Sequence, residues 1–154
     1  MKRFLSYGIV LLSVMIIYLS FKAEDPVLLK NTWTHYGGSP EQSKYFEGTE
    51  ITKQNVNQLQ VAWHYATDDD SPNFSSPVVV DTVMYLVAKN SSLVALSTIS
   101  GKEIWIHTGL TGISRRGLNY WESKDKKDKR LIFTLNNSLQ EIDVLTGKTI
   151  ESFG

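Results

Sequence analysis

The residue types that most often perform chemistry in proteins are sparse in this chain. Its three histidines, His35, His64 and His107, lie far apart without the short spacing of metal ligands, which indicates structural or exposed roles. The carboxylates of Asp68–Asp70 could hold a cation, although such a run more often forms a polar turn. No cysteine is present, which excludes a disulfide framework, a thiolate metal site and a cysteine nucleophile. These residues alone therefore identify no catalytic group and no metal site.

An internal repeat sets the elements that must position any functional group. The stretch Ser92–Trp105, SLVALSTISGKEIW, recurs in diverged form 46 residues later as Ser138–Glu151, SLQEIDVLTGKTIE. Each repeat unit reads as apolar runs separated by polar and glycine turns, which is typical of short strands. Repeats of about 40 to 50 residues built only from strands indicate the four-stranded blades of a β-propeller. The alternative is two unrelated hairpins that share a Gly-Lys turn by chance.

We predict an all-β fold that forms a partial β-propeller of about two blades. The first blade is expected to contain strands at 77–80, 83–88, 92–97 and 102–107. The second unit is expected to contain strands at 131–135, 139–143 and 149–153. Two units are too few to close a propeller ring, which typically has about 4 to 8 blades.

The residues between the two units, 108–130, are expected to form a connection. They include the charged run Glu122–Arg130, whose charges alternate in sign. This alternation favours a solvated hairpin tip over a binding patch.

The segment before the first blade is mostly loop, with a single helical turn expected at 55–59. Residues Gln60–Ala66 have the alternation of a strand, with Val61, Trp63 and Tyr65 on one face. A lone strand leaves its backbone groups unpaired, so this strand is expected to pair with another part of the propeller. A strand that precedes the first complete blade commonly completes the last blade.

Composition and charge limit the broad class of protein. The chain has 154 residues, is 42% hydrophobic and carries no net charge. That length can bury one ordinary core, and the balanced charge predicts no nucleic-acid partner.

The N-terminus carries a targeting signal. Lys2 and Arg3 precede an uncharged run from Phe4 to Phe21, and Lys22 follows it. The length of this run lies between that of a signal-peptide core and the roughly 20 residues that span a bilayer. The basic residues before the run favour a cytoplasmic N-terminus with the rest of the chain outside.

These features predict three regions. Residues 1–22 are expected to form a hydrophobic helix that serves as a signal anchor or signal peptide, with the uncleaved anchor favoured. Residues 23–32 are expected to form a linker, and residues 33–154 a propeller part located in the periplasm and anchored to the inner membrane.

Six segments of the chain occur in an order and spacing that resemble a known family. They are WTHYGG, ITKQNVNQLQVAWHYAT, SSPVVVDTVMYLV, LVALSTISGKEIW, RRGLNYW and LTGKTIESFG. Together they resemble the N-terminal part of pyrroloquinoline quinone (PQQ) dependent dehydrogenases over Trp33–Gly154. The resemblance implies a propeller of about eight blades. It also implies that the chain is the N-terminal part of a longer enzyme, either truncated or incompletely sequenced.

Blades of this family carry the motif Ala-x-Asp-x-x-Thr-Gly-Lys-x-x-Trp. Its tryptophan packs against the small alanine and the glycine turn of an adjacent blade. In the first copy Ala95, Gly101 and Trp105 match this motif. The second copy keeps the glycine but has Glu141 for alanine and Glu151 for tryptophan, which puts the docking contact there in question.

The resemblance also implies a cofactor. Members of the family oxidise alcohols or sugars with PQQ held on the propeller axis beside a calcium ion, and a respiratory quinone or a cytochrome accepts the electrons. PQQ is a tricarboxylate, which a guanidinium binds through paired, charge-assisted hydrogen bonds. Arg116 matches the Arg-Gly-x-x-Tyr-Trp element that contacts the cofactor, and Thr134 matches a threonine that hydrogen-bonds to it. The calcium ligands and the base carboxylate are expected beyond Gly154, so no catalytic or metal residue is assigned.

Two departures from the family refine the expected function. Phe74 stands where members place a Glu or Gln that faces the cofactor. The adjacent cysteines that stack on PQQ in methanol-type enzymes are also absent, and this absence favours the glucose and polyol branch. We therefore expect a piece of a quinoprotein dehydrogenase that is inactive alone. The alternative is a PQQ-like repeat propeller that serves as a non-enzymatic scaffold in outer-membrane protein assembly. The Arg116 element and the WTHYGG leader favour the dehydrogenase.

Overall fold

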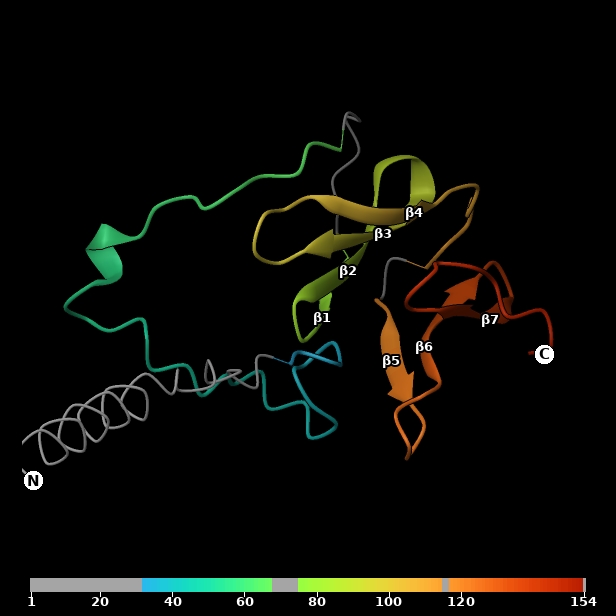
Figure 1. Cartoon of the computed structure of the whole chain (residues 1–154), viewed down its shortest axis with the longest axis horizontal. Helices are drawn as coiled ribbons and strands as arrows, with labels where there is room; N and C mark the ends of the chain where they lie inside the picture. The colour runs from blue at the N-terminus through green and yellow to red at the C-terminus, as the bar shows by residue number, and fades with distance from the viewer. Residues whose placement is uncertain (1–31, 68–74, 115–116, 154) are drawn as a thin grey trace, which may run out of the picture. The chain divides into compact units, whose positions relative to one another are not determined.

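The computed structural model describes residues 32–67, 75–114 and 117–153. The predicted anchor at 1–22 lies outside these residues. Within the described residues, no helix is long and apolar enough to cross a membrane. Their regular structure consists of seven strands in two antiparallel sheets, with two short 3₁₀ turns (Figure 1). The all-β prediction is therefore confirmed.

The first sheet has four antiparallel strands in sequence order, β1 Val78–Val80, β2 Val83–Ala88, β3 Ser92–Ser97 and β4 Glu103–His107. Their bounds agree with the four predicted strands to within one residue. The first three strands form in short apolar runs rich in valine and leucine, and β3, in the middle of the sheet, is buried over all but its last residue. Polar residues at positive φ turn the chain between them, Asp81 after β1 and Asn90 in the 3₁₀ turn η2 (Lys89–Ser91).

The second sheet has three strands in the order β5 Asn119–Glu122, β6 Lys129–Leu135 and β7 Ser138–Asp143. The strands β6 and β7 confirm two of the predicted strands. Residues 108–130 separate the two units, as predicted, but they also contain β5, a strand that the prediction missed and that pairs with β6. The charged run forms the hairpin between them, as predicted, and the Ser123 N–H donates to the Asp128 carbonyl at 2.8 Å.

The strand predicted at 149–153 does not form. A single bridge joins Thr149 to Ile142, and the Ile150 N–H donates to the Glu141 carbonyl at 2.9 Å. The chain then turns, with the Phe153 N–H donating to the Ile150 carbonyl at 3.1 Å. Glu151 stands where the first copy has Trp105, so this segment lacks the tryptophan that docks the corresponding strand of the first copy.

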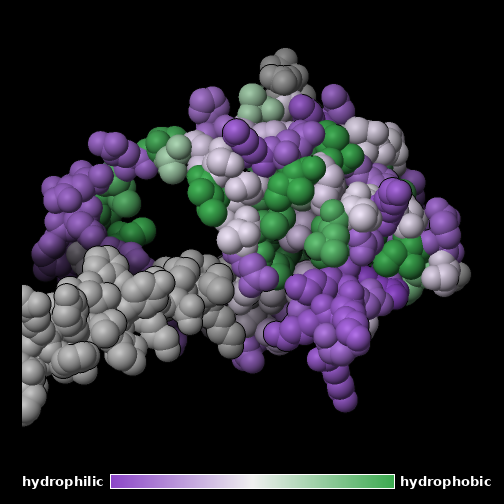
Figure 2. All heavy atoms as spheres, viewed as in Figure 1, coloured by the Kyte–Doolittle hydropathy of each residue, from purple (hydrophilic) through white to green (hydrophobic). Residues whose placement is uncertain are grey.

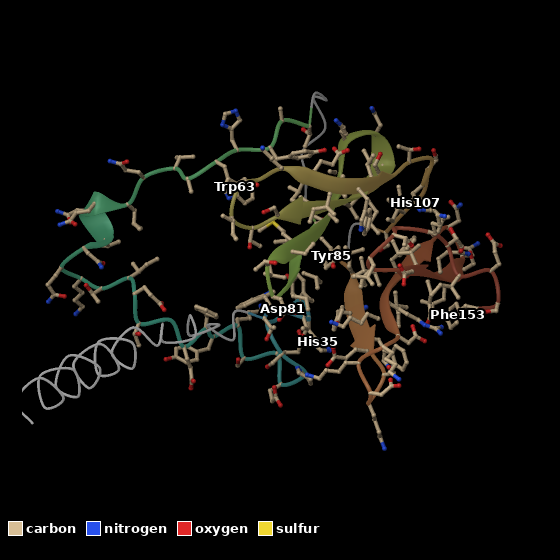
Figure 3. The ribbon with its side chains drawn as sticks, viewed as in Figure 1. His35, Trp63, Asp81, Tyr85, His107 and Phe153 are labelled. Atoms are coloured by element: carbon tan, nitrogen blue, oxygen red, sulfur yellow. The ribbon has the colours of Figure 1, made fainter. Side chains whose placement is uncertain are left out.

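One row of side chains crosses all four strands of the first sheet. Val78, Tyr85, Ala95 and Trp105 are register partners on neighbouring strands, so they share one face. Because Ala95 is small, the rings of Tyr85 and Trp105 on either side of it approach to 5.9 Å between centroids. This face and the second sheet bury one common core, which also includes Leu131, Phe133, Ile142 and Val144. Figure 2 shows hydrophobic side chains gathered across the middle of the visible face and hydrophilic ones over the β5–β6 hairpin.

Trp105 joins the first sheet to the second. Its indole Nε1–H donates to the Val144 carbonyl at 2.9 Å. Its ring lies over Gly147, where an added Cβ would sit 2.7 Å from Trp105 Cε3. Gly147 has a φ of +67°, a conformation that glycine adopts without steric penalty. The docking contact that Glu141 put in question therefore forms.

The same contact occurs one unit earlier, through Trp63. Its Nε1–H donates to the Thr98 carbonyl at 2.9 Å, and an added Cβ on Gly101 would sit 2.5 Å from Trp63 Cε3. The sequence motif did not single out Trp63 for this role.

The segment that carries Trp63 differs from the prediction. The helical turn expected before it is the 3₁₀ turn η1 (Val56–Gln58). The strand predicted at 60–66 does not form, because no strand of the described residues pairs with it. Its alternation instead directs Trp63 and Tyr65 to the first sheet, where the Tyr65 hydroxyl donates to Glu103 Oε2 at 2.8 Å.

Glu141 is buried at the position that Ala95 holds in the first copy, and Arg130 neutralises it. The Arg130 Nη1 donates to Glu141 Oε2 at 2.5 Å, while Nε donates to Asp128 Oδ1 at 2.8 Å. The bonds to Asp128 and then Glu141 hold the pKa of Arg130 above its ordinary value, and the bond from Arg130 holds the pKa of Asp128 below its own. A buried carboxylate requires such pairing, so the arginine on the neighbouring strand explains how the repeat tolerates the change from alanine.

We predict that Gly147→Ala destabilises the fold through two effects. A left-handed φ costs an alanine about 1–2 kcal/mol. The added Cβ would also press on an indole that a hydrogen bond holds in place, and such overpacking costs roughly 1–3 kcal/mol. The free energy of unfolding of the full chain should therefore fall by about 2–5 kcal/mol. Urea unfolding followed by tryptophan fluorescence measures it.

Gly109→Ala is the matched control. Gly109 also has a positive φ, +81°, but no atom lies within 4 Å of an added Cβ. The free energy of unfolding of this variant should fall only by the cost of a left-handed φ, about 1–2 kcal/mol. Equal losses in the two variants would show that the indole contact does not limit stability.

Candidate cofactor-binding site

Thr134 lies near the C-terminal end of β6, and its side chain is exposed. Its hydroxyl makes no hydrogen bond to any residue that the structure describes. A hydroxyl can both donate and accept a hydrogen bond. The Thr134 hydroxyl is therefore accessible, and its role in binding PQQ stays a prediction.

The loop between the two sheets is tied to this end of β6. The Ser114 N–H donates to the Thr134 carbonyl at 2.8 Å, and the Asn136 N–H donates to the Gly112 carbonyl at 3.0 Å. Ile113 forms a β-bridge with Leu135, and its side chain is buried. The loop is thus fixed beside Thr134 two positions before Arg116 in the sequence.

Arg116 itself lies outside the described residues, as do Arg115, Phe74 and Asp68–Asp70. The sequence did not predict the attachment of Ser114 to Thr134. The available signal was local, an apolar Ile113 directly after Gly112.

The WTHYGG leader connects the first strands of the two sheets. Trp33 and Val79 of β1 exchange two backbone hydrogen bonds, at 2.7 and 2.9 Å. The next residue, Thr34, accepts a bond from the Tyr120 N–H of β5 at 3.4 Å. The leader therefore supports the pair of strands that begin the two units.

The histidines take the roles predicted for them. His107 Nδ1 lies 2.5 Å from the Gly147 carbonyl, His35 Nδ1 lies 2.8 Å from Thr34 Oγ1, and His64 is exposed. Across residues 32–67, 75–114 and 117–153, no three His, Asp or Glu side chains gather as metal ligands.

The described part of the predicted site fits PQQ through one group. The free and exposed hydroxyl of Thr134 suits an oxygen-rich ligand, and the fixed loop before Arg116 approaches the same strand end.

Comparison with known proteins identifies the family. Residues 33–154 match the family model described as PQQ glucose/ethanol/alcohol dehydrogenase, beta-propeller domain. The dehydrogenase subunit of a quinone alcohol dehydrogenase from Gluconobacter oxydans (strain 621H) is 30% identical over 131 residues, covering 78% of this chain and 16% of that protein. A quinoprotein glucose dehydrogenase from the same organism is 25% identical over 150 residues, covering 79% of this chain and 19% of that protein.

A solved structure supports the fold. The quinohemoprotein alcohol dehydrogenase from Comamonas testosteroni superposes with a TM-score of 0.64 at 27% identity, covering 77% of this chain and 18% of that chain. The chain spans about a sixth of the length of the curated relatives it matches. The two sheets thus fit part of a β-propeller, as the repeat predicted. The chain belongs to the family of PQQ-dependent glucose, ethanol and alcohol dehydrogenases and forms part of their β-propeller domain.

Proposed function

We propose that this chain forms the N-terminal part of a quinoprotein dehydrogenase that oxidises a sugar or an alcohol with PQQ. The match of residues 33–154 to the propeller domain of such enzymes carries the proposal. The bond between Ser114 and Thr134 supports it, because it fixes the loop before Arg116 beside the second predicted cofactor residue. The alternative of a non-enzymatic scaffold has less support, since the relatives bear dehydrogenase names.

Arg116 and Thr134 are the residues of this chain that would hold PQQ. The guanidinium of Arg116 would pair with a carboxylate through two hydrogen bonds, and the Thr134 hydroxyl would bond to a further oxygen. When bound, PQQ supplies the quinone that accepts the substrate hydride. This chain contributes orientation of the cofactor, while a calcium ion and a base carboxylate are expected to be held by other parts of the protein.

The substrate and the electron acceptor are proposed at the level of chemical class. The absence of cysteine favours a sugar or polyol, whereas several relatives are named alcohol dehydrogenases. One relative, from Thauera butanivorans, is named 1-butanol dehydrogenase (cytochrome c). We propose a respiratory quinone or a cytochrome as acceptor for this protein as well.

The proposed location is the periplasmic face of the inner membrane. Residues 1–22 would form the anchor, residues 23–32 the linker and residues 33–154 the periplasmic part. The basic pair Lys2 and Arg3 before an uncharged run supports this orientation.

We predict that alkaline phosphatase fused after Gly154 is active in cells and remains with the membrane fraction. Alkaline phosphatase folds to its active form only outside the cytoplasm, so its activity reports the side of the membrane on which the fusion lies. An inactive fusion would contradict the orientation. An active fusion released with the soluble periplasm would contradict the anchor.

We predict that Arg116→Ala weakens PQQ binding in the complete enzyme, with the missing propeller supplied by the continuing gene or by a close relative. A hydrogen bond to a charged group contributes roughly 1.5–3 kcal/mol, and about 1.4 kcal/mol is tenfold in affinity. The affinity should therefore fall roughly ten- to a hundredfold. Arg116→Lys should recover only part of the lost affinity, because an ammonium cannot form the paired hydrogen bonds of a guanidinium. Titration of PQQ into the apo-enzyme, with regained activity as the signal, measures each affinity.

Arg115→Ala is the matched control and should leave the affinity nearly unchanged. Equal losses at Arg115 and Arg116 would show that general basicity matters and that the motif is misassigned, while no loss at either would favour the scaffold. A further control measures turnover by the 154-residue chain alone. It should give no turnover, because its described sheets leave apolar side chains such as Ile99 and Ile104 without neighbours.

A further inference from the structure

A cavity lies between the two sheets, at the end of β6 opposite to Thr134. Its volume is about 140 Å³, roughly ten times the space that a single water requires. Lys129 begins β6 and lines the cavity, so it is about 17 Å along the strand from Thr134. The cavity therefore does not overlap the predicted cofactor site. Its lining also includes Val80, Asp81, Val83, Tyr85, Tyr120 and Leu145.

Tyr85 provides an unused hydrogen-bond donor in this cavity. Its side chain is only 4% exposed, and its ring packs against Trp105. Its hydroxyl makes no hydrogen bond with any described residue. Burial, followed by the nearby carboxylates of Asp81 and Asp143, raises its pKa to about 12, so the hydroxyl stays protonated at neutral pH. No buried side-chain nitrogen or oxygen of the described residues lacks a partner, so this unpaired hydroxyl is open to the cavity and can donate to a ligand there.

The other polar groups at the cavity define what the ligand can be. Asp81, at the exposed turn after β1, and Lys129 form no ion pair among the described residues. The Tyr120 hydroxyl is already engaged, because it donates to Glu122 Oε2 at 2.9 Å. Burial and the bond to Glu122 raise the pKa of Tyr120, so it too remains protonated.

The balance of charge favours a neutral ligand. One carboxylate and one ammonium line the cavity, and two carboxylates act on the Tyr85 hydroxyl, which disfavours an anion beside it. An alcohol hydroxyl can accept the bond from Tyr85 and donate its own proton to a carboxylate. The remaining walls are aliphatic, from Val80, Val83, Val144 and Leu145.

We propose that this cavity binds a short-chain aliphatic alcohol, with its hydroxyl at Tyr85 and Asp81 and its methylene groups against the valines and leucine. The site is separate from the predicted PQQ site, and its binding does not depend on the proposed function. Affinity should be weak, in the millimolar range, because a molecule of about four heavy atoms makes few contacts.

The test is a titration of the isotopically labelled full chain with 1-propanol, followed by residue-resolved NMR. Saturable shifts are expected at Val83, Tyr85, Lys129 and Leu145. Propionate and propylammonium, which match 1-propanol in length, should bind the same residues at least several-fold more weakly. Tighter binding of either ion would overturn the neutral ligand class. Shifts that do not saturate, or that spread over the exposed apolar residues, would overturn the site itself and leave only water in the cavity.

Tyr85→Phe and Asp81→Asn test the two groups that are proposed to contact the alcohol hydroxyl. Tyr85→Phe removes only the hydroxyl and should weaken 1-propanol binding roughly three- to tenfold. Tyr120→Phe is its control, because that hydroxyl is engaged with Glu122, and its affinity should stay within about twofold. Asp81→Asn keeps a residue that tolerates the positive φ of the turn and should raise propionate binding several-fold. The proposal would be contradicted if Tyr85→Phe bound 1-propanol as tightly as the unchanged chain, or if Asp81→Asn bound propionate no more tightly. Each variant is a separate test, so one result suffices if the other variant fails to fold.

Discussion

An indole ring that lies against a left-handed glycine holds the two sheets of this protein together. Trp105 reaches Gly147 and the Val144 carbonyl from the first sheet, and Trp63 reaches Gly101 and Thr98 in the same way. The approach is possible only because glycine has no Cβ and tolerates positive φ. Each contact therefore needs a tryptophan from one unit and a glycine turn from the next, and this requirement explains why the glycine turn recurs in the second copy of the repeat.

The position of Thr134, one of the two predicted cofactor residues, follows from that arrangement. Docking of Trp105 places the second sheet, and the end of β6 then receives the loop that leads to Arg116 through Ser114 and Ile113. The same docking creates the interface that holds Tyr85, whose ring is buried and whose hydroxyl opens to the cavity between the sheets. One end of β6 thus carries Thr134 of the predicted cofactor site, and the other end carries Lys129 of the cavity. Both depend on the packing between the sheets.

The first sheet could be predicted from the sequence because alternation and turn residues both mark its strands. The second sheet was harder. Its first strand, β5, is short and carries Glu122 at the start of a charged hairpin, and the segment at 149–153 lacks the tryptophan that would fix it. The pairing of Glu141 with Arg130 joins two strands, so no local pattern indicates it. For the site, Thr134 and Arg116 came from the family resemblance, whereas the loop beside them and the cavity at Tyr85 arise from tertiary packing that periodicity does not encode.

Hydrogen exchange of the indole N–H groups tests the central claim most directly. The Trp63 and Trp105 Nε1–H groups donate to backbone carbonyls at an interface, whereas Trp121 is 45% exposed. In the folded chain, the Nε1–H signals of Trp63 and Trp105 should exchange with solvent at least tenfold more slowly than that of Trp121, an order-of-magnitude estimate for one net hydrogen bond at an interface. Equal exchange rates for the three indoles would contradict the account, because they would show that no tryptophan is docked on a glycine turn.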